Sequence, residues 1–350
     1  MKHRTLLGML TVLIAGCASA QEGSGAWMPY WDAKWRYEAT DLPGLNNDIR
    51  RNRFYANLGT VLSDESGFEF GAGLSLNAGT DNPARNRANK DNQRSNQVGI
   101  DRLYARISTG ALNWQFGKAP LSMTLSPLVW DHDLRPIGLS VDHSGVSEEG
   151  NGLRANLGYY APDFVFDNEK PRLAAAQLGW HWHEGQLSSF SAIVSYLRFS
   201  RLDGLPGNGI ARTNRRIGLN YQSDYELLDL QLIGRTHVFD HPLTVALDGV
   251  DNLGANDADQ AARISVTAGN ARAGGWEAGF AYQRNQRDAV LAIAADDEWW
   301  FQSFSRGGMP WLAYGFAGGG TVLRLASFDE RRDGSPSSAH RVLLDLSLGW

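Results

Sequence analysis

The sequence has almost no cysteine. Cys17 is the single cysteine among the 350 residues, and it lies in the N-terminal segment. An intrachain disulfide and a cysteine-ligated metal site are therefore excluded, because each needs at least two thiols. Redox chemistry based on a thiol pair is excluded for the same reason.

Long apolar runs are also missing beyond the N-terminus. After the stretch from Leu6 to Ala15, no apolar run approaches the ~20 residues that a membrane helix needs. Apolar residues at helical spacing are equally scarce there. Such a chain can enter a membrane only as a closed β-barrel, since only helices and closed sheets satisfy their backbone hydrogen bonds in lipid.

The N-terminus has the order of a secretory signal. Lys2 and Arg4 precede the apolar run, and the small residues Ala18-Ser19-Ala20 follow it as a cleavage site. We expect residues 1–20 to form a signal peptide that is removed on export. This places the protein outside the cytoplasm.

The exported part, residues 21–350, is expected to form a single domain. The alternative cleavage is that of a lipoprotein, which would leave Cys17 as a lipidated N-terminus.

Loss of Lys2 and Arg4 with the signal changes the net charge from −5 to about −7. This excess of acidic residues makes nucleic acid an unsuitable partner.

Alternation of apolar and polar residues, the pattern of a half-buried strand, recurs along the exported part. In the segment 68–76 the even positions are apolar and the odd positions are polar or glycine. Such a strand suits lipid on one face and water on the other. The same alternation occurs with the outward sets Leu103, Ala105 and Ile107; Leu112, Trp114 and Phe116; Leu178, Trp180 and Trp182; Leu228, Leu230 and Leu232; Ile264, Val266 and Ala268; and Trp276, Ala278, Phe280 and Tyr282.

The connections between these segments alternate in length. Outer-membrane barrels have short periplasmic turns and long extracellular loops, so this alternation indicates an all-β transmembrane barrel. The short connections are 63–67, 110–111, 184–185, 239–242, 271–275 and 318–320, and the long outside ones are 79–96, 119–136, 161–172, 249–261, 285–308 and 329–338.

The strand number follows from the same alternation. Counting every alternating segment gives seventeen strands, whereas bacterial barrels of this kind have an even number. The segment 212–223 is the weakest, because keeping it would place the tight turn 239–242 outside. Treating 201–225 as one long outside loop predicts an antiparallel barrel of sixteen strands.

In the last segment, 341–350, apolar residues at the even positions alternate with Arg341, Leu343, Asp345, Ser347 and Gly349, and the segment stops on Trp350. A terminal aromatic residue after such a strand resembles the signal read by the barrel assembly machinery of the outer membrane. The alternative is the edge strand of a soluble sandwich.

Several stretches together resemble the porin family of Gram-negative outer membranes. No single stretch is diagnostic, and their order, which covers nearly all of the exported part, carries the resemblance. The stretches are Trp35-Arg36-Tyr37-Glu38, Arg51-Asn52-Arg53-Phe54, Gly73-Leu74-Ser75-Leu76, Gly79-Thr80-Asp81-Asn82-Pro83, Asp101-Arg102-Leu103-Tyr104, Phe116-Gly117-Lys118, Leu128-Val129-Trp130-Asp131-His132-Asp133-Leu134, Gly138-Leu139, His241-Pro242-Leu243-Thr244 and Asp248-Gly249-Val250-Asp251-Asn252.

The resemblance implies a water-filled channel for passive diffusion of small hydrophilic solutes, with no enzymatic activity and no cofactor. It implies outer-membrane lipids and the barrel assembly machinery as partners, and a homotrimer by analogy. This chain is compact and ends in Trp350, where the family often has a longer chain and a final phenylalanine, and this difference leaves the pore size open.

The predicted inward positions carry more basic than acidic residues. They comprise Arg53, Arg102, Arg106, Arg154, Arg235, Arg263, Arg324 and Arg341 against Glu69, Asp229, Glu277 and Asp345. Arginine side chains around a confined, partly desolvated pore repel cations, which favours anions. The alternative is that these arginines pair with acidic loop residues and only stiffen the wall.

The loop 119–136 is the expected constriction. It is long, and its three prolines reduce its flexibility. Its residues Asp131 and Asp133 would face the wall arginines and set up a transverse field. The alternative is that this loop projects outward.

Three other patterns favour structural roles over catalysis or metal binding. The residue types of Asp142-His143-Ser144 are those of a hydrolase triad, but neighbours on a strand point to opposite faces. His181 and His183 share a face but have no evident third ligand. A third set of residues offers oxygen ligands, but its spacing is not that of a calcium-binding loop. This set is Asp248, Asp251, Asn252, Asp257 and Asp259.

Two other functions stay open at this point. One is a barrel with a blocked lumen in a structural or adhesive role. The other is a barrel enzyme of the lipase or protease type, which needs a convergent nucleophile and base that the sequence does not supply.

Overall fold

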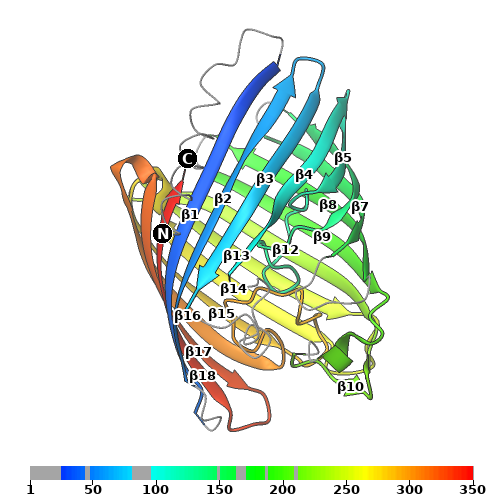
Figure 1. Ribbon diagram of the computed structural model, residues 1–350, viewed down its shortest axis with the longest axis vertical. Helices are drawn as coiled ribbons and strands as arrows, with labels where there is room; N and C mark the ends of the chain where they lie inside the picture. The colour runs from blue at the N-terminus through cyan, green and yellow to red at the C-terminus, as the bar shows by residue number, and fades with distance from the viewer. Residues whose placement is uncertain are drawn as a thin grey trace, which may run out of the picture.

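The computed structural model describes residues 25–43, 48–80, 96–147, 150–162, 171–185, 188–208 and 212–349. Within these ranges, sixteen antiparallel strands close into one barrel (Figure 1). The predicted all-β class and the strand number are confirmed. No helix in the described residues is long and apolar enough to cross a membrane.

The strands pair in chain order, and β1 pairs with β18 to close the ring. The first half contains β1 (Gly25–Asp41), β2 (Ile49–Asp64), β3 (Phe68–Gly79), β4 (Gln97–Thr109), β5 (Leu112–Lys118), β6 (Ile137–Val146), β7 (Gly152–Ala161), β8 (Arg172–Glu184) and β9 (Ser188–Ser200). The second half contains β12 (Tyr225–Val238), β13 (His241–Asn252), β14 (Gln260–Gly269), β15 (Gly275–Asn285), β16 (Ser305–Phe316), β17 (Thr321–Arg332) and β18 (Ser338–Gly349). Strand length varies from 7 residues in β5 to 17 in β1.

The connection between β9 and β12 contains a small separate hairpin. Its strands, β10 (Arg216–Ile217) and β11 (Asn220–Tyr221), have two residues each and pair only with one another. This is the segment that would have raised the count to seventeen. Its interpretation as part of one long loop is confirmed.

The connections are short at one end of the barrel and long at the other. The turn between β12 and β13 is the pair Phe239 and Asp240, both with positive φ (50° and 64°), which is the geometry of a tight hairpin turn. The first described residue, Gly25, pairs with Asp64 just before the turn to β3, so β1 begins at the short-turn end.

Three of the long connections are shorter than predicted. β13 continues to Asn252, β16 begins already at Ser305, and β17 continues to Arg332. Some polar residues of these strand ends face inward, as the buried side chains of Asn252 and Glu330 show, whereas Asp329 and Arg306 are exposed. An inward polar residue near a strand end has the same sequence signature as a loop residue.

The outer face of the barrel is apolar. Its exposed side chains include Leu157, Trp180, Trp276, Phe280 and Leu325. Trp182 and Tyr282, which belong to the predicted outward sets, are exposed as well. Apolar side chains that stay exposed around a closed sheet are the pattern of a wall in contact with lipid.

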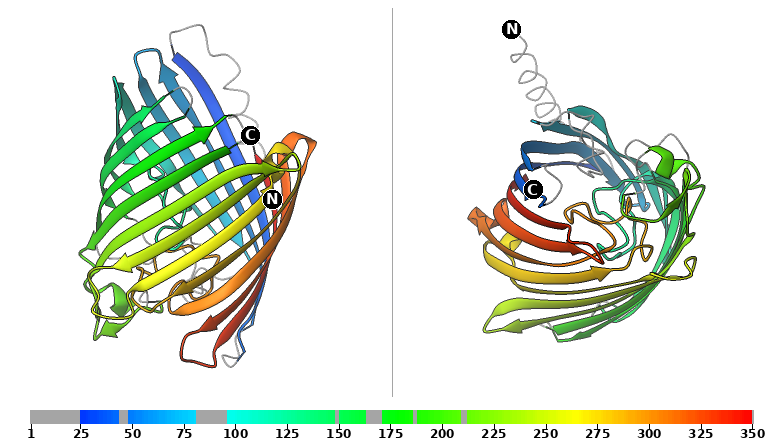
Figure 2. Two further views of the ribbon diagram at one scale, coloured as in Figure 1. Left: turned by 180° about the vertical axis from the view of Figure 1, so that it is seen from behind. Right: turned by 90° about the horizontal axis from the view of Figure 1, so that it is seen from below.

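Two loops fold into the interior of the barrel. They are the connection 119–136 between β5 and β6, and the connection 286–304 between β15 and β16, which the right view of Figure 2 shows inside the ring of strands. The connection 285–308 lies at the long-loop end as predicted, but it folds into the lumen instead of projecting outward. Residues 289–295 are all apolar and at most 2% exposed, so this segment is buried instead of facing water.

Some sequence features lie outside the described residues. These are the signal segment 1–20, Cys17 and the terminal Trp350. The strand that leads to Trp350 alternates as predicted, with Val342 exposed and Leu343 fully buried.

Candidate functional site

The first lumen loop, 119–136, rests on a row of polar side chains that crosses the wall formed by β7, β8 and β12. The Asn156 amide donates to the Ser122 hydroxyl at 2.6 Å. The Gln177 amide accepts from the Thr124 N–H at 3.0 Å and donates to the Thr124 carbonyl at 2.7 Å. These bonds fix the loop tip against one side of the barrel.

The two lumen loops share an apolar core with the same wall. Leu128 and Trp130 of the first loop cluster with Leu291 and Ile293 of the second. The wall contributes the inward side chains Leu173, Leu197, Phe199, Tyr225, Leu227 and Val250. These apolar inward positions break the polar-inside pattern because the loops cover them and exclude water.

The second loop is tied to the opposite side of the barrel by charge. Glu298 forms ion pairs with Arg36 of β1 and with Arg324 of β17, the latter at 3.2 Å. Burial opposes ionisation of Glu298, but the nearby Arg36 and Arg324 guanidinium groups hold its pKa well below the usual range. Arg341 of β18 donates to the Glu298 carbonyl at 2.7 Å.

The backbone of this loop is held by a buried carboxylate as well. The N–H groups of Trp300 and Phe301 donate to Glu330 of β17 at 2.6 and 3.1 Å. Together with the Glu298 pairs, these bonds place the second loop across the lumen, from the apolar wall to β1 and β18.

Acidic side chains gather where the two loops meet. The Asp131 N–H donates to the Ala294 carbonyl at 2.6 Å, and the Asp296 N–H donates to the Pro127 carbonyl at 3.1 Å. Burial raises the pKa of Asp131, and the neighbouring Asp297 adds to the shift. Burial and then Glu298 raise the pKa of Asp296 to about 6.

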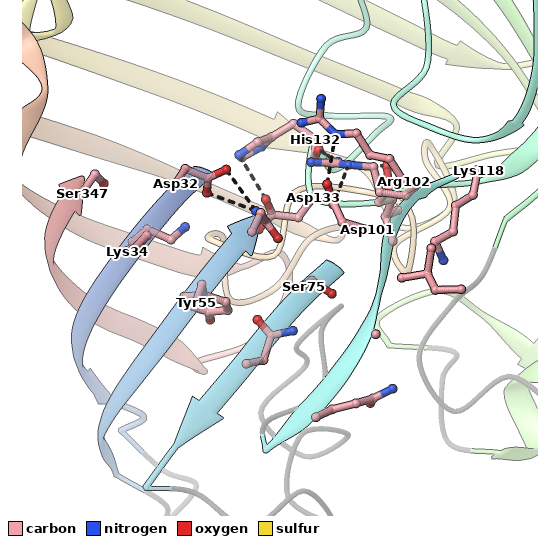
Figure 3. Close-up of a pocket in the computed structure, with 18 of the residues that line it drawn as sticks. Asp32, Lys34, Tyr55, Ser75, Asp101, Arg102, Lys118, His132, Asp133 and Ser347 are labelled. Carbon is pink, nitrogen blue, oxygen red and sulfur yellow. Dashed lines mark hydrogen bonds and ion pairs between the residues drawn. The ribbon is translucent and has the colours of Figure 1, made fainter. Parts of the chain in front are cut away.

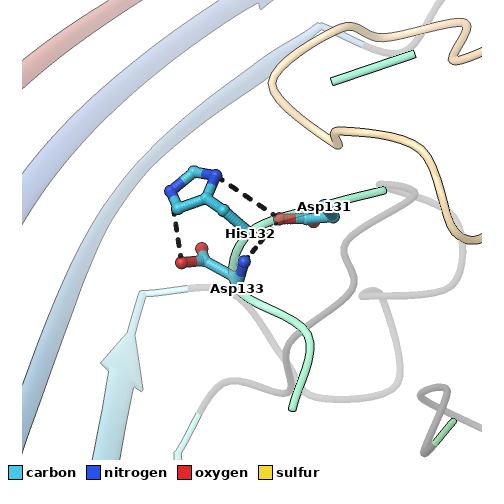
Figure 4. A group of neighbouring side chains, drawn as sticks. All are labelled: Asp131, His132 and Asp133. Carbon is cyan, nitrogen blue, oxygen red and sulfur yellow. Dashed lines mark hydrogen bonds and ion pairs between the residues drawn. The ribbon is translucent and has the colours of Figure 1, made fainter. Parts of the chain in front are cut away.

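A candidate metal-ligating group lies at this junction. The ligand atoms of Asp131, His132 and Asp133 lie within 4.8 Å of one another, as do those of Asp131, Asp296 and Asp297. In Figure 4 the His132 ring lies between the two carboxylates, 3.8 Å from Asp131 and 3.5 Å from Asp133. Burial opposes ionisation of Asp133, yet Lys34, His132 and Arg135 lower its pKa, so nearby cations already compensate this carboxylate.

A cavity of about 850 Å³ separates the loops from the wall formed by β1 to β4. Figure 3 shows Lys34, Tyr55 and Ser75 on the strands, with His132 and Asp133 on the loop side. The lining extends from Asn77 and Gln97, beside the long connection 80–96, to Arg272 in the short turn between β14 and β15. The cavity therefore reaches residues at both ends of the barrel.

The charge of the cavity lining is positive overall. It contains five basic side chains, Lys34, Arg102, Lys118, Arg135 and Arg272, and three carboxylates, Asp32, Asp101 and Asp133. A field in such a confined space falls off slowly because little water screens it. The formal charge of the lining is therefore positive.

A β-bulge brings two of these charges together. The register of β3 and β4 shifts at Gly73, so both Asp101 and Arg102 face the lumen although they are adjacent in sequence. Asp101 pairs with Arg102 at 3.0 Å and with Arg135 of the loop at 3.3 Å. This carboxylate links the wall to the loop.

Aromatic rings hold the basic side chains of the wall in place. The Arg102 guanidinium lies 4.5 Å from the centre of the Tyr30 ring. Lys34 and Arg53 each lie 4.9 Å from the centre of the Tyr55 ring. Cation–π contacts of this kind restrict long side chains without cancelling their charge.

All the predicted site residues within the described ranges have inward positions, but their surroundings differ. Arg53, Arg102 and Arg106 are on the β2 and β4 wall, where Arg106 donates to Gln115 at 2.8 Å. Arg263 pairs with Asp248 at 3.4 Å, and Arg324 pairs with Glu298. Arg154 and Arg235 are exposed in the short-turn half. Asp131 and Asp133 lie on the first lumen loop.

The weaker sequence patterns are not brought together. Asp142 accepts from Asn113 inside the barrel at 2.8 Å, whereas the His143 ring lies near the Ala111 carbonyl at the turn, so no triad forms. Asp257 pairs with Arg215 at 2.5 Å, away from Asp248. Among the described residues, the candidate metal groups include neither His181 nor His183.

Sequence reasoning missed Lys34, Arg36, Asp101 and Glu298. Lys34 and Arg36 alternate with exposed Trp31 and Trp35 and could have been included by the same period-2 argument. For the second loop the signal was its apolar run 289–295, which no extracellular loop needs. No sequence signal indicated the bulge at Asp101.

Comparison with known proteins identifies the fold. No family model and no curated protein matches this sequence. Among solved structures, OprB of Pseudomonas putida aligns with a TM-score of 0.61 at 13% identity, covering 99% of this chain and 97% of its own. A loop-deletion mutant of the outer-membrane protein OmpT of Vibrio cholerae aligns with a TM-score of 0.55 at 14% identity, and the alignment covers 94% of this chain and 100% of the mutant. A triple mutant of the porin of Rhodopseudomonas blastica aligns with a TM-score of 0.52 at 12% identity, and the alignment covers 92% of this chain and 100% of the mutant.

Proposed function

We propose that this chain, which has the fold of bacterial porins, is an outer-membrane channel for passive diffusion of small hydrophilic solutes. The observation that carries the proposal is the cavity between the lumen loops and the β1 to β4 wall, because polar residues from both ends of the barrel line it. An aqueous path through a closed barrel in lipid is a channel.

An anion preference is part of the proposal. The cavity lining has more basic than acidic side chains, and Arg53 lies close to it on the same wall through its contact with Tyr55. The alternative, in which all arginines pair with loop carboxylates, applies to Arg36 and Arg324. It does not apply to Arg154 and Arg235, for which no ion pair occurs among the described residues.

Processing, assembly and location follow as proposals from the sequence. Residues 1–20 would direct export, with Cys17 as the alternative lipidation site, and residues 21–350 would form the single barrel domain. Trp350 would be read by the barrel assembly machinery. The exposed apolar face would contact outer-membrane lipid, and a homotrimer is expected by analogy only.

An enzymatic role has no supporting arrangement in the described residues. Asp142 and His143 diverge, and Asp131, His132 and Asp133 offer no nucleophile beside a base. A blocked lumen is the stronger competitor, since two loops occupy the interior. The two functions predict opposite results in a conductance measurement.

Single-channel recording in planar bilayers tests the proposal. We expect stepwise conductance of the purified protein, and under a salt gradient we expect a reversal potential on the anion-selective side. The double variant Arg102→Gln with Arg135→Gln should move the reversal potential toward cations, because it removes two of the five basic side chains of the cavity. Exchange of Arg198 and Arg216 for glutamine is the matched control, since both lie exposed outside the cavity lining.

Absence of steps in the unmodified protein would rule out the channel and favour the blocked barrel. Steps with cation selectivity would retain the channel and rule out the anion preference.

A further inference from the structure

A band of basic side chains crosses the lumen wall in the short-turn half of the barrel. It consists of Arg154 on β7, His181 and His183 on β8, and Arg235 on β12. None of these residues lines the cavity described above. The band faces the lumen on the short-turn side of the polar row that seats the first loop.

The strand register shows how the band is assembled. Arg154 pairs with Gly179 of β8, and the His181 ring lies beside this glycine, since a Cβ there would be 3.1 Å from His181 Nε2. His183 and Arg235 both pair with Ser189 of β9, one from each side. The four side chains therefore follow a diagonal over four neighbouring strands.

The band is accessible to water although it faces inward. Arg154, His183 and Arg235 are exposed, and His181 is half-buried. The loops do not cover this part of the wall, because their contacts end at the row formed by Asn156 and Gln177. A solute in the lumen can reach these groups.

The positive charge of the band is not neutralised by partners in the described part of the chain. Neither Arg154 nor Arg235 has an ion pair or a side-chain hydrogen bond there. The carboxylate on the adjacent strand β6, Asp142, accepts from Asn113 at 2.8 Å. This contrasts with Arg36, Arg263 and Arg324, each of which has an acidic partner.

Small and hydroxyl-bearing residues surround the band. The His181 Nδ1 atom lies 2.9 Å from the Ser191 hydroxyl, which fixes the ring. Gly179 and Ser189 leave space between the charged groups. Guanidinium, imidazole and hydroxyl groups on one stretch of the lumen wall match the oxygens of a phosphate or carboxylate.

We propose that Arg154, His181, His183 and Arg235 form a binding site for a small oxyanion, a phosphate or a multivalent carboxylate, in the short-turn half of the lumen. The site rests on the proposed function only in that its ligand enters through the channel. It lies on the wall opposite the main cavity and would hold an anion after the constriction.

Calorimetric titration of inorganic phosphate and of citrate into the detergent-solubilised protein tests the site. The double variant Arg154→Gln with Arg235→Gln should weaken binding of the preferred anion about tenfold or more, because two charge-assisted contacts are lost. The control is the double variant Arg198→Gln with Arg216→Gln, which removes the same charge from exposed positions outside the lumen. Circular dichroism and heat-modifiable migration of all proteins verify that the barrels are folded.

Binding of phosphate alone, of citrate alone or of both, each lost selectively in the Arg154 and Arg235 variant, supports the site and names its ligand class. Equal binding by both double variants, or no binding by the unmodified protein, overturns it. The titration needs no current across a bilayer. A protein that binds the anion without conductance would therefore contradict the channel but not the site.

Discussion

Glu298 connects the second lumen loop to the barrel wall through a single side chain. It is 16% exposed and pairs with Arg36, which is 4% exposed. Removing one partner of a largely buried ion pair costs more than removing an exposed one, because the remaining charge stays desolvated. Arg36 keeps a second partner, since it also bonds to both oxygens of Asp345 at 2.7 Å.

The substitution Glu298→Gln is expected to destabilise the protein by about 2 kcal/mol, since Arg36 retains Asp345 while Arg324 loses its nearer partner. The same change should increase single-channel conductance, because the second loop loses its tie to β1 and β17. Urea unfolding in lipid vesicles, followed by tryptophan fluorescence, measures the first effect.

Glu226→Gln is the matched control. Its carboxylate pairs with Arg198, whose side chain is 62% exposed, so a loss below about 1 kcal/mol is expected. Equal destabilisation by the two variants would show that the Glu298 pairs do not anchor the loop.

At the residue scale, alternation identified the inward arginines because a strand in a closed barrel has only two faces. Arg102 and Arg106 could be assigned from their neighbours Leu103 and Ile107, which are exposed outside. Asp101 could not, because the bulge at this position turns two consecutive residues inward. The alternation of residues in the sequence therefore does not reveal where a bulge interrupts it.

At the scale of elements, the two lumen loops behave as one unit. They share an apolar core and exchange backbone hydrogen bonds through Asp131 with Ala294 and through Asp296 with Pro127. Carboxylates lie at this contact, so its strength depends on their protonation.

The contact between the loops is expected to weaken as pH rises. The pKa of Asp296 is raised from 3.8 to about 6, so the protonated form is favoured in the folded protein. Its contribution to stability is complete below about pH 4 and is lost as pH passes through about 6. The burial of Asp131 acts in the same direction. We therefore expect lower conductance at pH 5 than at pH 7.5, measured on single channels.

The variant Asp296→Asn tests the origin of this pH dependence, because an amide keeps the shape but does not titrate. It should reduce the difference in conductance between the two pH values. An undiminished difference would assign the effect to other groups.

The sequence predicted the strands, but it predicted an inward path for only one of the two lumen loops. The loop 119–136 was expected inside because of its length and prolines, whereas 286–304 was assigned to the outside from its position in the alternation. The alternation of short and long connections along the chain decides at which end of the barrel a connection lies. Whether it then folds inward depends on its own apolar residues, here Ala289 to Ala295, and on an apolar wall to receive them.

At the scale of the whole molecule, the barrel is divided into two unlike halves. The side from β7 to β14 has a dry apolar core beneath the loops, and the side from β1 to β4 has the polar cavity. Solutes are therefore expected to pass along one side of the lumen and not through its centre. The charges along that side then set the selectivity.

The proposed anion selectivity should depend strongly on salt. The Debye length is about 10 Å at 0.1 M and about 3 Å at 1 M, so the field of the cavity lining reaches across the lumen only in dilute salt. We expect the reversal potential under a fixed concentration ratio to approach that of free diffusion when both solutions are concentrated tenfold. A reversal potential that does not change would indicate selection by direct contact instead of by the field.

The inward path of the first loop also alters the height of the wall. The chain leaves the sheet after Lys118 and rejoins it at Ile137, which leaves β5 with 7 residues where β1 has 17. At ~3.3 Å per residue and a tilt of about 40°, these strands rise about 18 Å and about 43 Å along the barrel axis. A hydrocarbon layer about 25 Å tall fits β1 but exceeds β5. We therefore expect the bilayer to thin beside β5, at the place where the first lumen loop enters the barrel.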